Sequence, residues 1–133
     1  MLKRPTTDWR DTIEEQTAQI AAGELEKDDA WALKFWPLAM IDAADPLMAS
    51  FEATLAGLGT EPTDESILAA VKDLVLALNT VDDEHGHPFE TSEREQLCEY
   101  IEKALEDAGI DVAALTARQG IDRHGITDKW RNW

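Results

Sequence analysis

The sequence predicts an all-α protein, a single compact helical bundle of about five to seven helices without a sheet. Two observations lead to this prediction. Apolar residues recur with the 3.6-residue period of a helix in every segment of useful length. No segment shows the alternation of Val, Ile or Thr, or the Asn-Gly turn, that is typical of hairpins. The chain has 133 residues, 44% of them hydrophobic, so residues 1–133 are expected to form one acidic domain with its own core.

Two helices are expected before Pro37. The first spans residues 7–22 and ends at Gly23, because its apolar positions follow the helical period. Pro37 must kink or split the second, because proline has no N–H and crowds the preceding turn. This second helix begins at Asp28 or Asp29, and its apolar residues are Trp31, Leu33, Phe35 and Trp36.

Two longer helices are expected in the middle of the chain. The Asp-Pro pair at 45–46 is typical of an N-cap followed by a first helical residue, so a helix is predicted to begin there and to end at Gly57 or Gly59. The next helix spans residues 64–79, after Thr63 or Asp64 as N-cap. Little of its circumference is polar, so it is predicted to be the central helix, with the apolar residues Ile67, Val71, Leu74, Val75 and Leu78.

Three further helical segments are expected towards the C-terminus. Ser92 as N-cap and Glu95 at the third helical position would form a capping box, and Gly109 would end that helix in the left-handed conformation. A short helical segment is expected over residues 111–118. A closing helix is expected over residues 126–133, because three apolar residues share one face there: Ile126, Trp130 and Trp133.

The charge balance restricts the classes of partner. The chain has 28 acidic and 12 basic residues and a formal net charge of −16. Such a surface would be repelled by nucleic acids and anionic lipids. No segment contains the roughly 18 consecutive apolar residues of a membrane helix, and the N-terminus has no apolar stretch typical of a signal peptide. The sequence therefore predicts a cytoplasmic protein that binds neither nucleic acid nor membrane directly.

Residues 80–90 are expected to form a loop, and they concentrate groups that bind metal ions. Three acids at 82–84 and a fourth at Glu90 surround His85 and His87. Imidazoles and carboxylates are metal ligands, but the spacing matches neither an EF-hand nor a His-Glu-x-x-His motif. We therefore favour a solvated polar turn, and predict no metal and no cofactor. A metal-dependent enzyme or metal sensor that uses His85 and His87 is the alternative.

Motifs of the common catalytic sites are not found in the sequence. It contains no Gly-x-Ser-x-Gly elbow, Walker loop or Gly-x-Gly-x-x-Gly motif. The single cysteine, Cys98, cannot form an internal disulfide, and the acids around it disfavour the reactive thiolate. The sequence therefore predicts that the protein is not an enzyme.

Acidic residues are concentrated in the middle of the chain. Between Glu61 and Asp111 there are 15 acidic and three basic residues, a net charge of −12, whereas residues 116–133 have a net charge of +2. Self-repulsion of this size opposes compaction. Two interpretations stay open, a surface that serves solubility and a surface that binds a basic partner.

The tryptophans lie near the two ends of the chain. Trp9, Trp31 and Trp36 are predicted to be core residues. Trp130 and Trp133 end the chain, where residues fray unless they dock. We expect them to dock onto the first helices of this domain, and the alternative is that they contact a partner.

Two segments resemble a known class of protein. Residues 90–101 (ETSEREQLCEYI) and 125–133 (GITDKWRNW) resemble the closing pattern of small, acidic, uncharacterised bacterial proteins of the immunity-protein type. The resemblance covers the last third of the chain, and the size, acidity and helical content are similar as well. It implies a protein that binds and neutralises a toxin domain. It assigns no functional residue, because immunity proteins share no motif.

The predicted function is an acidic protein-binding domain whose negative surface complements a basic partner and speeds association. A secretion chaperone or adaptor is a further alternative that relies on the same physics. The oligomeric state and the identity of the partner stay open. The predicted partner-binding residues are Asp82, Asp83, Glu84, Glu90, Glu99, Glu102, Glu106, Trp130 and Trp133.

Overall fold

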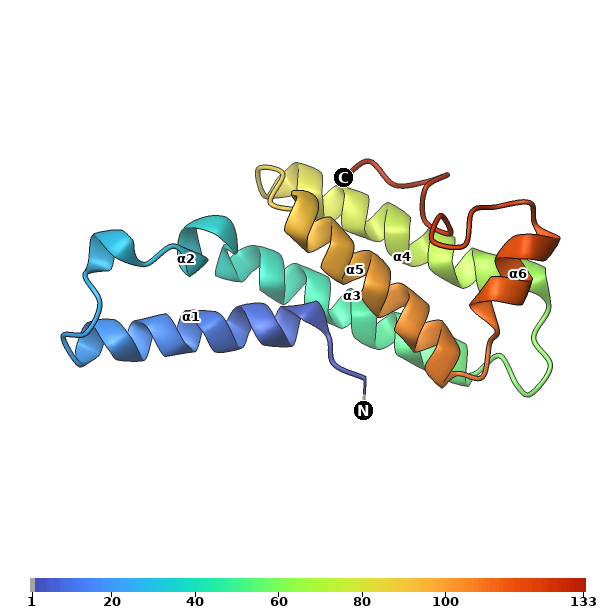
Figure 1. Cartoon of the computed structure of the whole chain (residues 1–133), viewed down its shortest axis with the longest axis horizontal. Helices are drawn as coiled ribbons and strands as arrows, with labels where there is room; N and C mark the ends of the chain where they lie inside the picture. Colours follow the sequence, from blue (N-terminus) through green and yellow to red (C-terminus); the bar gives the residue numbers. More distant parts are fainter. Residues whose placement is uncertain (1) are drawn as a thin grey trace.

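The computed structural model describes residues 2–133, which form helices joined by turns and irregular segments (Figure 1). No strand occurs within that range, so the all-α prediction is confirmed. None of the helices in residues 2–133 has the combination of length and apolar composition needed to cross a bilayer. The six α-helices, with one short 3₁₀ helix at Lys27–Asp29, are α1 (Pro5–Ala21), α2 (Ala32–Phe35), α3 (Leu38–Ala56), α4 (Asp64–Glu84), α5 (Thr91–Asp107) and α6 (Val112–Arg118).

An antiparallel pair, α3 and α4, lies at the centre of the bundle, and α1 packs on α3 (Figure 1). Helix α5 packs on α1 and contacts α3 through Tyr100. After α6 the chain turns back and runs along α4 towards the turn that joins α4 to α5. Two hydrogen bonds with Asn79 hold this tail, one from its Nδ2 to the Trp130 carbonyl at 2.7 Å and one from the Asn132 N–H to its Oδ1 at 3.0 Å. The last residues therefore lie beside the C-terminal half of α4.

The central position of α4 agrees with its apolar pattern. Val71, Val75 and Leu78 are fully buried, and the Thr63 hydroxyl caps the helix by accepting the Ser66 N–H at 3.1 Å. The predicted end at Asn79 is wrong, because α4 continues to Glu84. Val81 and Asp82 are also buried and extend the buried face by another turn, so the connection to α5 comprises only residues 85–90.

The predicted start of the third helix at the Asp-Pro pair is also wrong. Pro37 does split the chain, because α2 ends at Phe35 and α3 begins at Leu38. Pro46 then lies inside α3 and is exposed. The helix passes through it because one apolar face is continuous on both sides of the proline, and its buried members are Met40, Ile41, Ala44, Met48, Phe51 and Leu55.

Replacing Pro46 with alanine is expected to stabilise the protein. Proline cannot donate to the carbonyl of Asp42 and is the poorest residue in a helix interior, by about 3 kcal/mol relative to alanine. Stiffening of the unfolded chain by proline offsets up to about 1 kcal/mol of this. We expect Pro46→Ala to raise the unfolding free energy by about 1 to 3 kcal/mol in urea denaturation. A loss of stability would contradict this expectation.

The N-cap of α5 is displaced from the predicted one. Glu90 is the N-cap, and its capping box is completed by Glu93, whose Oε1 accepts the Glu90 N–H at 3.2 Å. Ser92 and Glu95 therefore have no capping role, because the helix begins at Thr91. The predicted glycine ends are confirmed: Gly23 and Gly109 have left-handed φ angles of 74° and 84°, and Gly57 is the C-cap of α3.

The expected closing helix over residues 126–133 does not form. Residues 126–130 form turns and residues 131–133 are irregular, and the N–H groups of Trp130 and Arg131 both donate to the Thr127 carbonyl. Its backbone instead hydrogen-bonds to Asn79, and a regular helix could not offer both groups at once. The expectation that the tail docks within this domain is confirmed, but it docks from an irregular segment onto α4, the α4–α5 turn and α5, and not onto the first helices.

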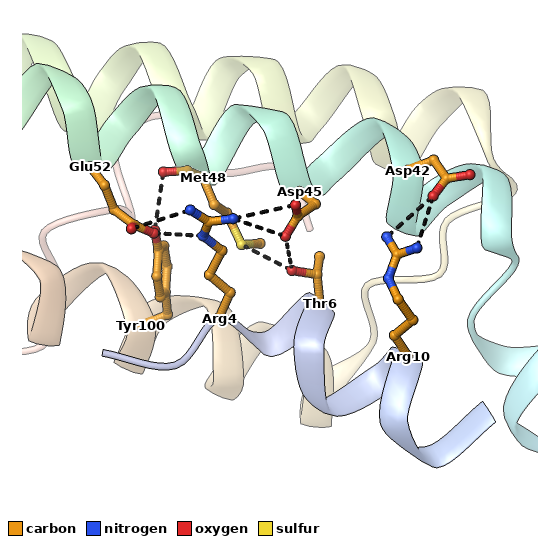
Figure 2. Close-up of polar contacts among 8 residues, drawn as sticks. All are labelled: Arg4, Thr6, Arg10, Asp42, Asp45, Met48, Glu52 and Tyr100. Atoms are coloured by element: carbon orange, nitrogen blue, oxygen red, sulfur yellow. Dashed lines mark hydrogen bonds and ion pairs between the residues drawn. The ribbon is translucent and has the colours of Figure 1, made fainter. Parts of the chain in front are cut away.

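Ion pairs join the N-terminal segment and α1 to α3 (Figure 2). The Arg4 Nε donates to Glu52 at 2.8 Å, and its Nη1 lies 3.3 Å from Asp45. The hydroxyl of Tyr100, from α5, donates to the same Glu52 carboxylate at 2.5 Å. Burial, reinforced by this hydrogen bond, raises the pKa of Tyr100 well above its usual value. This cluster therefore connects three parts of the chain, with Tyr100 as a permanent donor.

The acid of this cluster stays ionised. Partial burial alone would raise the pKa of Glu52, but the hydrogen bonds from Arg4 and Tyr100 outweigh it and hold that pKa below its usual value. The guanidinium of Arg4 is correspondingly held charged, since its hydrogen bond to Glu52 raises its pKa. Both acids of this cluster, Asp45 and Glu52, pair with Arg4, so we assign the cluster a structural role.

Candidate functional site

Six aromatic rings form a row of consecutive contacts, which we call the aromatic row. Neighbouring ring centroids are between 5.2 and 6.0 Å apart, the distance range of favourable aromatic pairs. The row joins α1, α2, the α4–α5 turn and the C-terminal tail. Its members, in order of contact, are Phe35, Trp31, Trp36, Trp9, Phe89 and Trp133.

The row is buried at its middle and exposed at one end. Trp9 is fully buried, and its indole N–H donates to the Gln96 side chain at 2.7 Å. At the exposed end, 44% of Trp31 and 55% of Phe35 are accessible. The prediction of a core position is therefore confirmed for Trp9 and Trp36 and wrong for Trp31. Because α2 is a single turn, it can bury Ala32 and Trp36 only by turning its other apolar residues outwards.

Other apolar side chains are exposed beside this end of the row. Leu33 is 49% and Leu38 is 47% accessible. Among residues 2–133 five large apolar side chains are exposed, and four of them lie between residues 31 and 38; the fifth is Leu76 on α4. Scattered exposed apolar residues are ordinary, but a cluster is typical of an interaction surface.

A groove of about 880 Å³ runs along the aromatic row. Trp31, Phe35 and Phe89 line it, together with polar residues of the α4–α5 turn and of α5. Trp36 and Trp133 also line it, and their indole N–H groups are buried without an acceptor in the part of the chain that the structure describes. An unpaired buried donor is unfavourable, so these two indole groups reduce the stability that the aromatic row provides.

The acids of the α4–α5 turn divide into buried and exposed groups. Asp82 is 4% accessible, and its carboxylate accepts the Phe89 N–H at 3.0 Å and the His87 Nδ1 at 2.9 Å. It therefore holds the turn together and is not available on the surface. The other three acids predicted here are exposed, namely Asp83, Glu84 and Glu90.

The turn brings together three of the expected metal-binding groups. Ligand atoms of Asp82, Asp83 and His87 lie within 4.8 Å of one another. His85 is not among them, because its Nδ1 contacts the Val81 carbonyl at 2.8 Å. The imidazole of His87 already pairs with Asp82, so the arrangement is that of a hydrogen-bonded turn.

Stability is expected to depend on the protonation of His87. The hydrogen bond to Asp82 raises the pKa of His87 above 6.5, so the charged pair contributes fully below pH 6.5, and its contribution is lost as the pH rises through the folded-state pKa. We expect His87→Ala to remove this part of the pH dependence while the protein stays folded. Denaturation of both forms between pH 6 and pH 8 tests this, and parallel pH profiles would contradict it.

The three predicted binding acids of α5 are engaged within the chain. Glu99 lies 2.9 Å from the Lys103 amine. Glu102, whose side chain is 15% accessible, pairs with Arg123 and also contacts His124, and Glu106 pairs with Arg123 at 3.2 Å. The loop after α6 thus covers this part of α5, which is less negative than its sequence indicates.

The two tail tryptophans differ in exposure. Trp133 is 6% accessible and ends the aromatic row, and its carbonyl accepts the Arg94 Nε–H at 3.2 Å. Trp130 is partly buried against the core. The guanidinium of Arg131 lies over the Trp133 ring, 5.4 Å from its centroid, which is the geometry of a cation–π contact.

Sequence reasoning missed the exposed pair Trp31 and Phe35. One signal could have indicated exposure here: on a helix Leu33 lies opposite Trp31 and Phe35, so the apolar residues of this short segment cannot all face the core. Comparison with family models, with curated proteins and with solved structures gives no match for this chain.

Proposed function

We propose that this chain is an acidic protein-binding domain of the immunity type, which neutralises a basic partner such as a toxin domain in the bacterial cytoplasm. The observation that supports this best is the exposed apolar end of the aromatic row in a chain of net charge −16. Apolar residues with surrounding charge are the usual composition of a protein interface, in which the apolar part provides affinity and the charge provides rate and specificity.

Much of the negative charge is free to attract a partner. Within residues 2–133, fewer than half of the 28 carboxylates lie within 4.0 Å of a basic nitrogen. The segment that leads into α2 has four exposed acids, Glu24, Glu26, Asp28 and Asp29. Together with Asp83, Glu84 and Glu90 they place exposed carboxylates on the elements next to the groove.

The test begins with a partner recovered from cells of the source organism by pull-down with the tagged chain. We expect a basic protein that inhibits growth when produced alone, with growth restored when this chain is produced with it. Association should be fast at low salt and slow steeply with ionic strength, because exposed charges are screened beyond about 8 Å at physiological salt. A captured protein that is not basic, or whose toxicity this chain does not relieve, would contradict the proposal.

Two double variants with the same change in net charge test whether association depends on the acids next to the groove or on the total charge of the chain. Asp83→Lys with Glu84→Lys changes exposed acids next to the groove, and lysine is favourable at the C-terminus of α4. Glu61→Lys with Asp107→Lys changes exposed acids at the opposite end of the bundle (Figure 1). We expect the first pair to slow association more. Equal rates for wild type and both variants would mean that the acids serve solubility alone.

A metal-dependent enzyme or metal sensor is the second candidate, favoured by the three donor groups of Asp82, Asp83 and His87. Stoichiometric Zn, Mn or Fe in the purified protein, lost in His87→Ala, would place this candidate first. A secretion chaperone or adaptor would bind its partner through the same surface, and it differs in that the partner is delivered and not inhibited.

A further inference from the structure

We propose that the exposed end of the aromatic row, Trp31 and Phe35, is the docking site for a basic amphipathic helix of the partner, whose arginine side chains stack on these rings beside its apolar residues. This inference rests on the proposed function and deepens it, since it names the element of the partner and the residues that receive it.

Exposure and support of the rings provide the first argument. Trp31 packs edge-on against Trp36 at 5.2 Å, and Trp36 stacks on the buried Trp9 at 5.9 Å. The exposed ring is thus held by a fixed core and loses little conformational entropy on binding. Aromatic residues held in this way are the usual hot spots of protein interfaces.

The opposite end of the row shows the same chemistry within the chain. There the Arg131 guanidinium lies over the Trp133 ring, 5.4 Å from the centroid. Trp31 and Phe35 have ring surface exposed and no guanidinium over them in the part of the chain that the structure describes. An arginine from a partner would therefore make the same cation–π contact at this end of the row.

Charge selects a basic occupant. Asp28 and Asp29 are exposed just before Trp31, and Glu90 lines the groove. The chain as a whole has a net charge of −16, so an acidic or neutral helix would gain nothing from its field, and a second copy of this chain would be repelled. Leu33 and Leu38, both about half exposed, offer apolar contacts for the other face of the same helix.

The probes are three synthetic peptides of equal length. The first has leucines on one helical face and arginines on the other, the second replaces every arginine with glutamate, and the third replaces every leucine with serine. Each is titrated by calorimetry into the wild type, into Trp31→Ala with Phe35→Ala, and into the matched control Leu76→Ala, which removes an equally exposed leucine from α4. Phe35→Ser alone serves if the double variant fails to fold.

We expect the arginine–leucine peptide to bind the wild type and the glutamate peptide not to bind. The double variant should weaken the arginine–leucine peptide at least about tenfold, with Leu76→Ala unchanged. If the arginine–leucine and arginine–serine peptides bound equally well, and the double variant did not change their affinity, the docking site would be overturned. The proposal of an acidic binding domain would then still stand. No binding of either arginine peptide at low salt would overturn the proposed function as well. A wild-type dimer that the double variant converts to a monomer would assign the surface to a second copy and overturn the inference.

Discussion

Val71→Asp is expected to leave the chain unfolded under conditions in which the wild type is folded. Val71 is fully buried on α4, the helix that packs along α3 at the centre of the bundle. The substitution removes about 1.5 to 3 kcal/mol of apolar burial and adds a charge without a partner, which costs several kcal/mol more. The sum is comparable to the whole stability of a domain, about 5 to 15 kcal/mol. Far-ultraviolet circular dichroism and thermal melting measure the result.

Leu76→Asp is the control for this experiment. Leu76 lies on the same helix but is 43% exposed, so an aspartate there reaches water. We expect it to change the unfolding free energy by about 1 kcal/mol or less. A Val71→Asp protein that melts like the wild type would show that α4 is not the core helix.

Local sequence patterns predict the elements whose stability is local or periodic. The apolar stripe that includes Val71 and Val75 predicts α4, because residues at this spacing all fall on one face of a helix and that face must lie in the core. Gly23 and Gly109 predict helix ends because left-handed φ angles favour glycine. Pro37 predicts a break because it has no N–H. Each of these signals acts within a few residues.

The errors arise where a distant contact decides the local structure. Pro46 was expected to begin a helix, but the burial of Met40 and Ile41 against the rest of the bundle extends α3 on its N-terminal side. The tail has a helical apolar pattern over residues 126–133, yet hydrogen bonds to Asn79 hold it in turns. Two acids of α5, Glu102 and Glu106, pair with Arg123, which lies in a loop well beyond them in sequence.

The candidate site could be predicted only in part. The acidic composition and the grouping of tryptophans near the ends are visible in the sequence. Which tryptophan remains exposed is decided by the length of α2, a single turn that buries Ala32 and is followed by the buried Trp36. The sequence predicts Asp82 on the surface with its neighbours, but its carboxylate is buried and accepts hydrogen bonds from the Phe89 N–H and the His87 ring.

Trp9→Ala is expected to lower the unfolding free energy by about 3 to 5 kcal/mol, the usual cost of removing a fully buried large aromatic side chain. Trp9 is fully buried, stacks on Trp36 at 5.9 Å and contacts Phe89 at 6.0 Å. Its loss would therefore open a cavity between α1, α2 and the α4–α5 turn and divide the aromatic row. Urea denaturation gives the free energy, and near-ultraviolet circular dichroism reports the loss of aromatic packing.

Trp9→Phe separates ring packing from hydrogen bonding. Phenylalanine keeps an aromatic ring between Trp36 and Phe89 but loses the N–H that donates to Gln96 at 2.7 Å. Because Gln96 is exposed, water can satisfy its carbonyl oxygen, and the lost bond with a small cavity should cost only about 1 to 2 kcal/mol. Equal losses for the two variants would mean that the hydrogen bond, and not the row of rings, holds α1 in place. A smaller loss for Trp9→Phe would show that the packing of the ring against Trp36 and Phe89 contributes more than the hydrogen bond.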